Sequence, residues 1–422
     1  MTSLLADVRP LRESPAYRRL MVGQLLSLTG SFMTRVAVAV QVYALTGSSL
    51  AVGLVGLATA LPLLVLGLLG GSIADALDRR RLVLATSAAL ALLSLALAGQ
   101  ALAGLRQLWL LYLLVALQSA LTAVQAPATR TFAPRLLGPD RQAEVQALYS
   151  LSFQLAMVVG PLLAGVLIAA AGVEATYAVD ALSFLAALWA VRRLPPMKPT
   201  GGGTRAGLRA VAEGLRYVRR QKVLTGVLLI DLDATVIGFP KALFPALAVT
   251  RLGGGARTVG LLYAAIAVGG VAASVLSGPL TRLRRQGRLM VLAVAVWSTC
   301  FAGLGLVRAV WPALLLLALA GAADVANGLV RGTLLQVLTP DRLRGRVNSV
   351  GFVVGAGGPS LGDVEAGGLA ALTSPAVSAF AGGVASLVGV GALTLALPAV
   401  WRYDAGSDEQ LSAGDAGPGD TD

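Results

Sequence analysis

Long hydrophobic runs separated by short polar segments dominate the 422-residue chain. Nearly all of them exceed the roughly 17 residues that a transmembrane helix needs. The pattern therefore predicts an all-α integral membrane protein with 12 transmembrane helices. The runs fall at 20–45, 50–74, 82–104, 108–128, 145–171, 176–191, 223–249, 258–279, 289–307, 312–331, 347–372 and 376–400.

Basic residues lie almost entirely on one side of these predicted spans. Counted along the loops and ends, 28 fall on the side of the amino terminus and 4 on the other. The positive-inside rule then places both termini in the cytoplasm. Because lysine is rare while alanine, glycine and leucine abound, the composition is typical of a GC-rich bacterial genome. We expect a multi-pass protein of the bacterial inner (plasma) membrane.

Changes in composition divide the chain into five segments. We expect a cytoplasmic lead-in at 1–19, six-helix bundles at 20–191 and 223–401, a cytoplasmic linker at 192–222 and a disordered acidic tail at 402–422. The linker is rich in proline and glycine, which is typical of a connection between domains. Its second part, Leu208 to Arg220, has the pattern of an amphipathic helix on the membrane surface.

The second bundle repeats the first. Val52-Gly53-Leu54 aligns with Val259-Gly260-Leu261, and Pro139-Asp140-Arg141 aligns with Pro340-Asp341-Arg342. The alternative, chance similarity among helices rich in alanine and leucine, does not readily produce matching loop residues. Six spans per copy give both copies the same orientation, the parallel arrangement of many secondary transporters, which hold their substrate between the halves.

The composition excludes several functions. The chain has no histidine and one cysteine, Cys300, so a histidine-ligated metal, a Ser-His or Cys-His catalytic pair and an internal disulfide are impossible. No nucleotide-binding G-x-x-x-x-G-K-[ST] sequence is present in the cytoplasmic loops. The net charge of +13 does not indicate nucleic-acid binding, because no long polar domain carries it. We expect a monomer without cofactor or enzymatic activity.

Charged residues inside the spans are the most specific clue to function. A charge near mid-bilayer costs at least about 2.5–3.5 kcal/mol, so each one needs a partner, a proton or a water-filled cavity. Asp231 and Asp233 lie about 200° apart around their helix and should face different neighbours. The alternative role for all of these residues is a structural ion pair. The candidates for substrate binding or proton coupling are Arg35, Asp231, Asp233, Lys241, Asp324, Asn327, Asp363 and Glu365.

Two further features concern the ends and the middle of spans. Gly238-Phe239-Pro240-Lys241 should interrupt its helix and free backbone carbonyls beside Lys241. Asp180 and Glu174 are expected near the outer surface, where water would solvate them.

The segment from Gly71 to Arg81 resembles the signature loop of the major facilitator superfamily. Gly71, Asp75, Arg79 and Arg80 match its pattern, whereas Asp78 and Ala76 depart from it. The resemblance implies the major facilitator fold, with spans 1, 4, 7 and 10 around a central cavity. It also implies that Asp75 holds a cytoplasmic gate shut near a helix end and arginines of the opposite half.

Other segments resemble the branch of this superfamily that contains enterobactin exporters. They are Leu262–Ile266, Leu335-Gln336, Thr339–Asp341, Gly345–Asn348, Gly362-Asp363 and Leu372–Pro375. Gly160-Pro161 resembles the motif of antiporters, although close helix packing explains it equally well. Arg130 and Arg331, at cytoplasmic ends of spans, are expected to serve the gate or the topology.

Together these observations favour a secondary active exporter of an amphipathic small molecule, a siderophore or a drug. Alternating access would couple export to proton entry, and carboxylates would carry the protons because no imidazole is present. An importer of the same fold is the first alternative. A membrane protein without a transport function is the second. Its partners would be the small-molecule substrate, protons and the lipid bilayer.

Overall fold

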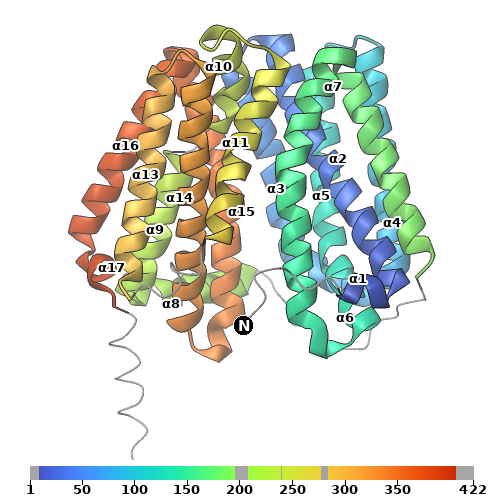
Figure 1. The fold of residues 1–422 in the computed structure, drawn as a ribbon. Helices are drawn as coiled ribbons and strands as arrows, with labels where there is room; N and C mark the ends of the chain where they lie inside the picture. Colours follow the sequence, from blue (N-terminus) through green and yellow to red (C-terminus); the bar gives the residue numbers. More distant parts are fainter. Residues whose placement is uncertain (1–8, 195–207, 239, 277–283, 405–422) are drawn as a thin grey trace, which may run out of the picture.

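The computed structural model describes residues 9–194, 208–238, 240–276 and 284–404, without the side chains of 68–76, 139, 208–210 and 342. Within these ranges every regular element is a helix, so the all-α prediction is confirmed. The N-terminal half (9–194) and the C-terminal half (208–404) stand side by side in Figure 1. Most helices run the full height of the molecule.

The N-terminal half contains eight helical elements among its described residues. They are α1 (Arg9–Glu13), α2 (Pro15–Thr46), α3 (Ser49–Ala76), α4 (Arg79–Leu102), α5 (Leu108–Arg130), α6 (Phe132–Leu137), η1 (Pro139–Arg141) and α7 (Gln142–Arg192). Local sequence fixes several boundaries: the side chains of Ser14, Ser48 and Asp78 cap α2, α3 and α4, and Gly47 ends α2 in a left-handed conformation.

The described C-terminal half begins with α8 (Leu208–Arg220) in the linker. It continues with α9 (Lys222–Val236), η2 (Lys241–Leu243), α10 (Phe244–Thr250), α11 (Ala256–Val275), α13 (Gln286–Leu306), α14 (Val310–Val337), α15 (Asp341–Leu372), α16 (Pro375–Ala396) and α17 (Pro398–Arg402).

Ten stretches of the described residues are long and apolar enough to cross a membrane. One of them is the 51-residue α7, which covers the fifth and sixth predicted spans and breaks at Gly172 with φ 82° and ψ 174°. Helix α15, the eleventh predicted span, is 32 residues long and is not among the ten. A multispan membrane protein is therefore confirmed, and the count of twelve spans stays a prediction.

The linker helix α8 has the bounds that the sequence predicts. Its Val218 is buried against Leu335 and Val347, and Tyr217 donates a hydrogen bond to the carbonyl of Leu338 at 2.9 Å. Arg346 of α15 forms an ion pair with Glu213 at 2.7 Å. The apolar face of α8 thus packs on α14 and α15 of the C-terminal half.

The two halves pack on each other mainly through two helix pairs, α3 with α15 and α7 with α11. Gly165 of α7 and Gly260 of α11 face each other in the second of these contacts. A Cβ built on Gly165 would lie 3.0 Å from the carbonyl oxygen of Ala256 and 3.2 Å from the Cα of Gly260. The missing side chains therefore permit this approach, as small residues do between transmembrane helices.

Candidate functional site

An interruption of the seventh predicted span positions the central basic residue. Helix α9 ends at Val236, and the chain resumes as η2 at Lys241 and as α10 at Phe244. The predicted break is confirmed. Two aromatic side chains satisfy the carbonyls that it frees: Trp297 donates to Gly238 at 2.8 Å, and the hydroxyl of Tyr263 donates to Lys241 at 3.4 Å. Residue 239 lies outside the described residues.

Four of the predicted charged residues come together at this break. The ammonium group of Lys241 interacts electrostatically with Asp324 of α14, Asp363 of α15 and Arg35 of α2. The phenol of Tyr263 in α11 interacts with Arg35 and Asp363. We call these five residues the central cluster. It joins both halves of the molecule and holds two cations and two carboxylates.

Asp363 also completes the backbone of the interrupted span. Its Oδ1 atom accepts a hydrogen bond from the backbone N–H of Ala242 at 2.8 Å. This contact gives a partner to a donor that the helix break would otherwise leave unpaired. One carboxylate therefore serves both the charge balance and the backbone of the cluster.

The two charged residues in the middle of α2 and α14 face open space. Arg35 and Asp324 are exposed, although both lie far from the ends of their helices. The Arg35 guanidinium lies over the ring of Phe32, 4.9 Å from its centroid. Charges in such positions are accessible to water, protons and solutes between the helices. Glu365 is also exposed, and none of the described residues pairs with it.

One turn from Asp324, a buried polar group links α9 to α14. Asp231 is 1% exposed, accepts a hydrogen bond from Nδ2 of Asn327 at 3.1 Å and forms an ion pair with Arg331. Asp324 interacts electrostatically with both Asp231 and Arg331. Asp324 and Asn327 line the same small cavity, and Arg331 extends the line of charges toward the end of α14.

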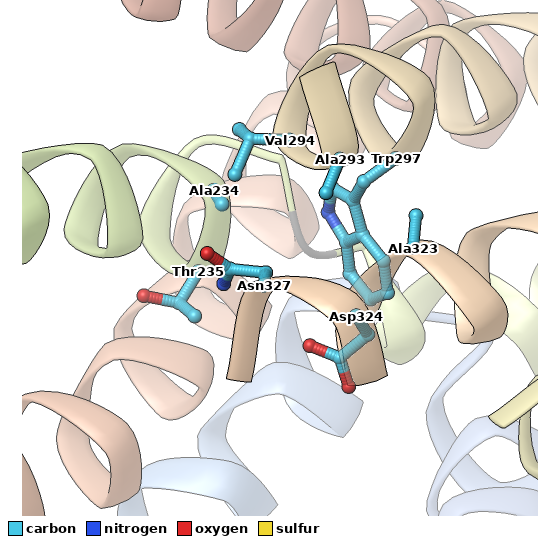
Figure 2. Close-up of a pocket in the computed structure, with 8 residues that line it drawn as sticks. All are labelled: Ala234, Thr235, Ala293, Val294, Trp297, Ala323, Asp324 and Asn327. Carbon is cyan, nitrogen blue, oxygen red and sulfur yellow. The ribbon is translucent and has the colours of Figure 1, made fainter. Parts of the chain in front are cut away.

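Figure 2 shows the small cavity beside these residues. Its volume is about 10 Å³, enough for about one water molecule. Trp297 covers one side, while Thr235, Asp324 and Asn327 contribute polar groups. Trp297 and Tyr263 were not expected from the sequence, because aromatic residues within apolar runs carry no signal of a polar partner.

Asp233 faces a different neighbour from Asp231, as their helical spacing predicts. Its Oδ2 atom accepts a hydrogen bond from the hydroxyl of Ser386 in α16 at 2.9 Å, and Ser386 lies 2.8 Å from the hydroxyl of Ser298 in α13. The structure thus places Asp233 in a junction between helices of the C-terminal half, away from the central cluster.

The expectation that Asp180 is solvated near the surface is wrong. Asp180 is 1% exposed, and its Oδ2 atom accepts hydrogen bonds from Thr34 of α2 at 2.8 Å and Ser94 of α4 at 2.7 Å. These hydroxyl groups come from distant segments, so the local sequence could not reveal them. Glu174, which we expected beside it at the surface, is half-buried.

A known protein family matches nearly the whole chain. The family described as transmembrane secretion effector, a part of the major facilitator superfamily, matches residues 5–413. The chain belongs to this family.

Curated relatives include the enterobactin exporter EntS of Escherichia coli strain K12, which is 27% identical over 414 residues, covering 98% of this chain and 99% of the relative. The enterobactin exporter of Citrobacter koseri is 28% identical over 395 residues, covering 94% of each chain. Both alignments cover nearly the whole chain, so the similarity is not confined to one half.

Solved structures share the fold. A mutant of the nucleoside transporter NupG superposes with a TM-score of 0.71 at 13% identity, covering 92% of this chain and 100% of that one. A bacterial homologue of the iron transporter ferroportin, in an inward-facing state, has a TM-score of 0.67 at 18% identity, covering 92% and 99%. The major facilitator fold predicted from the sequence is therefore confirmed.

In this member of the transmembrane secretion effector family, the structure describes the side chains of only some signature-loop residues. Gly71 and Asp75 lie in the last turns of α3, and their side chains lie outside the described residues. Arg80 donates from Nε to the carbonyl of Val191 at 3.4 Å and from Nη2 to that of Arg192 at 2.5 Å. Arg80 therefore binds the C-terminal end of α7 in its own half, which is favourable for a cation.

The remaining gate candidates occupy helix ends and contacts. Arg79 begins α4, and Arg130 is exposed at the end of α5. Gly160 of α7 packs against α2 at Phe32, and the carbonyl of Pro161 faces Gly260 of α11. Both the antiporter interpretation and the packing interpretation of Gly160-Pro161 are compatible with these contacts.

Proposed function

We propose that this protein is a secondary active exporter of an amphipathic small molecule, a siderophore by relation to the enterobactin exporters. The central cluster carries the proposal. Helices of both halves supply its charges, so a change in the angle between the halves alters the cluster directly. Membership of a transporter family and full-length similarity to two enterobactin exporters support export over an unrelated membrane function.

Proton antiport requires cargo and proton to compete for one group, and Asp324 is the best candidate. An ionised carboxylate accepts hydrogen bonds from the hydroxyl groups of a cargo. A proton bound to the same carboxylate removes its charge, weakens its hydrogen bonds to the cargo and so releases the cargo. Arg35 and Lys241 would meanwhile hold acidic groups of the cargo. Cargo that contacts both Arg35 of α2 and Asp324 of α14 links the two halves. Its release frees the halves to move apart in alternating access.

Liposomes that contain purified protein and an enclosed pH dye test both the coupling and its direction. Enterobactin is added outside vesicles whose lumen is acidic, and in parallel outside vesicles whose lumen is alkaline. Uptake driven only by an acidic lumen, with protons leaving, supports antiport. Uptake driven only by an alkaline lumen indicates proton-coupled import, the alternative function. Protein-free vesicles control for leakage.

Matched variants then locate the coupling group. Asp324→Asn keeps the size of the side chain and should lower cargo-driven proton movement by at least about tenfold, a loss of about 1.4 kcal/mol of coupling. The control is Asp341→Asn, because Asp341 is 86% exposed and pairs only with Arg344 among the described residues. Normal coupling in Asp324→Asn would reject the assigned role of Asp324.

We further propose that the protein is a monomer with both termini in the cytoplasm. Residues 20–191 and 223–401 would act as the two moving bundles. The cytoplasmic gate would be controlled by Asp75, Arg79, Arg130 and Arg331. The excess of basic loop residues on one side supports the orientation. Glu365, Asp231 and Asp233 stand outside the central cluster and are assigned no cargo contact in this proposal.

A further inference from the structure

A second and much larger cavity lies within the N-terminal half. Its volume is about 480 Å³, which is in the range of pockets that hold drug-sized ligands. Helices α2, α4, α5, α6 and both limbs of α7 line it, with residues between 17 and 191 only. None of the residues of the central cluster is among them. The cavity therefore has a lining of its own, which comes within one turn of the central cluster where Ser31 precedes Arg35 on α2.

The lining changes in character from its buried to its exposed residues. The buried lining residues are mostly apolar: Leu90 of α4, Phe184 of α7 and Leu20 of α2 are at most 4% exposed, and the buried Ser87 of α4 lies among them. The exposed lining residues follow one stripe of α5 and the first turns of α7: Thr122, Ala126, Arg130, Gln142 and Gln146. These lie one helical turn apart on each helix and form the rim. An amphipathic ligand would meet apolar surface with its inner part and hydrogen-bonding groups with its outer part.

Many hydrogen-bonding groups of this lining have no partner within the described protein. The side chains of Gln24, Gln142, Gln146, Tyr149 and Arg130 form no hydrogen bond with another described residue, and the buried hydroxyl of Tyr17 has none either. Polar groups inside a membrane protein are costly when they are left unsatisfied. Water or a ligand with several donors and acceptors must satisfy them.

The charges of the lining select the class of ligand. Arg130 is the one cation among the lining residues, and no aspartate or glutamate accompanies it there. Glutamine, serine, threonine and tyrosine side chains supply both donors and acceptors. Such a lining suits neutral or anionic molecules that carry hydroxyl and carbonyl groups on an aromatic or aliphatic body. An organic cation would find no carboxylate to pair with.

We propose that this cavity is a separate cargo compartment for neutral or anionic, hydroxyl-rich amphipathic compounds, and that it excludes organic cations. The inference rests on the proposed export function and adds a compartment and a substrate class to it. The compartment's exposed lining residues Arg130, Gln142 and Gln146 lie next to the basic loop between α5 and α7. Cargo would occupy it before reaching the central cluster between the halves.

The chain's single cysteine makes a direct test of occupancy possible. Cys300 is buried in α13 of the other half and can be replaced by alanine. A cysteine is then introduced at the rim as Thr122→Cys or Gln146→Cys, and its reaction rate with N-ethylmaleimide is measured in nanodiscs. Enterobactin, a neutral-to-anionic probe, should slow labelling at both positions by at least about tenfold at saturation. Ethidium, an organic cation, should leave both rates unchanged.

Two controls separate this inference from the proposed function. Asp341→Cys, at the exposed first residue of α15, should react at the same rate with and without enterobactin. Arg130→Gln should weaken protection by enterobactin about tenfold, and Arg130→Lys should restore most of it.

Enterobactin that drives proton movement in the wild type but leaves both rim cysteines unprotected would overturn the compartment and leave the export function intact. Protection by ethidium equal to that by enterobactin would overturn the assigned substrate class. Protection without any coupled transport would support the compartment and count against proton-coupled export.

Discussion

The Oδ2 atom of Asp180 accepts a hydrogen bond from the hydroxyl of Thr34 at 2.8 Å, which ties the second limb of α7 to α2. A comparable junction exists in the C-terminal half, where Asp233 of α9 accepts from Ser386 of α16 at 2.9 Å. If the predicted repeat is followed, α2 corresponds to α9 and the second limb of α7 to α16. Each half therefore joins its corresponding helices through a buried carboxylate, although different helices supply it.

Removal of the Asp180–Thr34 hydrogen bond should weaken the fold by a measurable amount. Hydrogen bonds between transmembrane helices contribute about 0.6 kcal/mol on average and up to about 1.7 kcal/mol. The variants Asp180→Ala and Thr34→Val, and the double variant, form a cycle that isolates the pair. Thermal unfolding in detergent should yield a coupling within that range. Strictly additive losses would mean that the two side chains do not stabilise one another.

Arg331 should be required for stability because it balances a buried charge. Asp231 is 1% exposed and forms an ion pair with this arginine. Breaking a buried pair by removing one member costs about 3–5 kcal/mol, and Arg331 is partly exposed, so the lower end applies. Arg331→Met should lower the thermal midpoint strongly in detergent.

The double variant Arg331→Met with Asp231→Leu provides the control. It removes both charges, so it should regain most of the lost stability. If the double variant is as unstable as the sum of its single variants, the ion pair is not the reason for the effect.

Asp363 should matter through its acceptor oxygen as well as through its charge. Its hydrogen bond to the N–H of Ala242 supports the restart of the seventh span after its break. Asp363→Asn retains an acceptor and should preserve stability, whereas Asp363→Ala should lose about 1–3 kcal/mol because a buried donor is left unpaired. Thermal unfolding compares the two variants. Equal loss in both would assign the effect to the charge alone.

The sequence predicted the four charged members of the central cluster, but not Tyr263, because charges inside apolar runs are expensive and therefore conspicuous. Four residues stand out in this way: Arg35, Lys241, Asp324 and Asp363. The segment Gly238-Phe239-Pro240 indicates the break beside Lys241. The sequence did not reveal which carboxylate pairs with which cation, because helix rotation and tilt decide the contacts. It placed Asp180 wrongly, since Thr34 and Ser94 lie 146 and 86 residues away from it.

The large cavity of the N-terminal half was also beyond the sequence. Its glutamine, serine and threonine residues are spread over four helices, α2, α4, α5 and α7, and each of them is unremarkable within its own sequence. Only the packing of α2, α4, α5, α6 and α7 collects them. Signature residues such as Gly71 and Arg80 identified the superfamily, but a loop motif gives no information about cavities elsewhere.

The close contact between α7 and α11 should be necessary for transport. A side chain at Gly165 would meet the carbonyl of Ala256 at 3.0 Å and the Cα of Gly260 at 3.2 Å, so Gly165→Val must push the halves apart at this point. Gly368→Val is the matched control, because no atom lies within 4 Å of a Cβ built there. Gly165→Val should retain enterobactin protection at the rim of the N-terminal cavity but lose cargo-driven proton movement. Wild-type transport by Gly165→Val would mean that this contact can open without loss of the transport cycle.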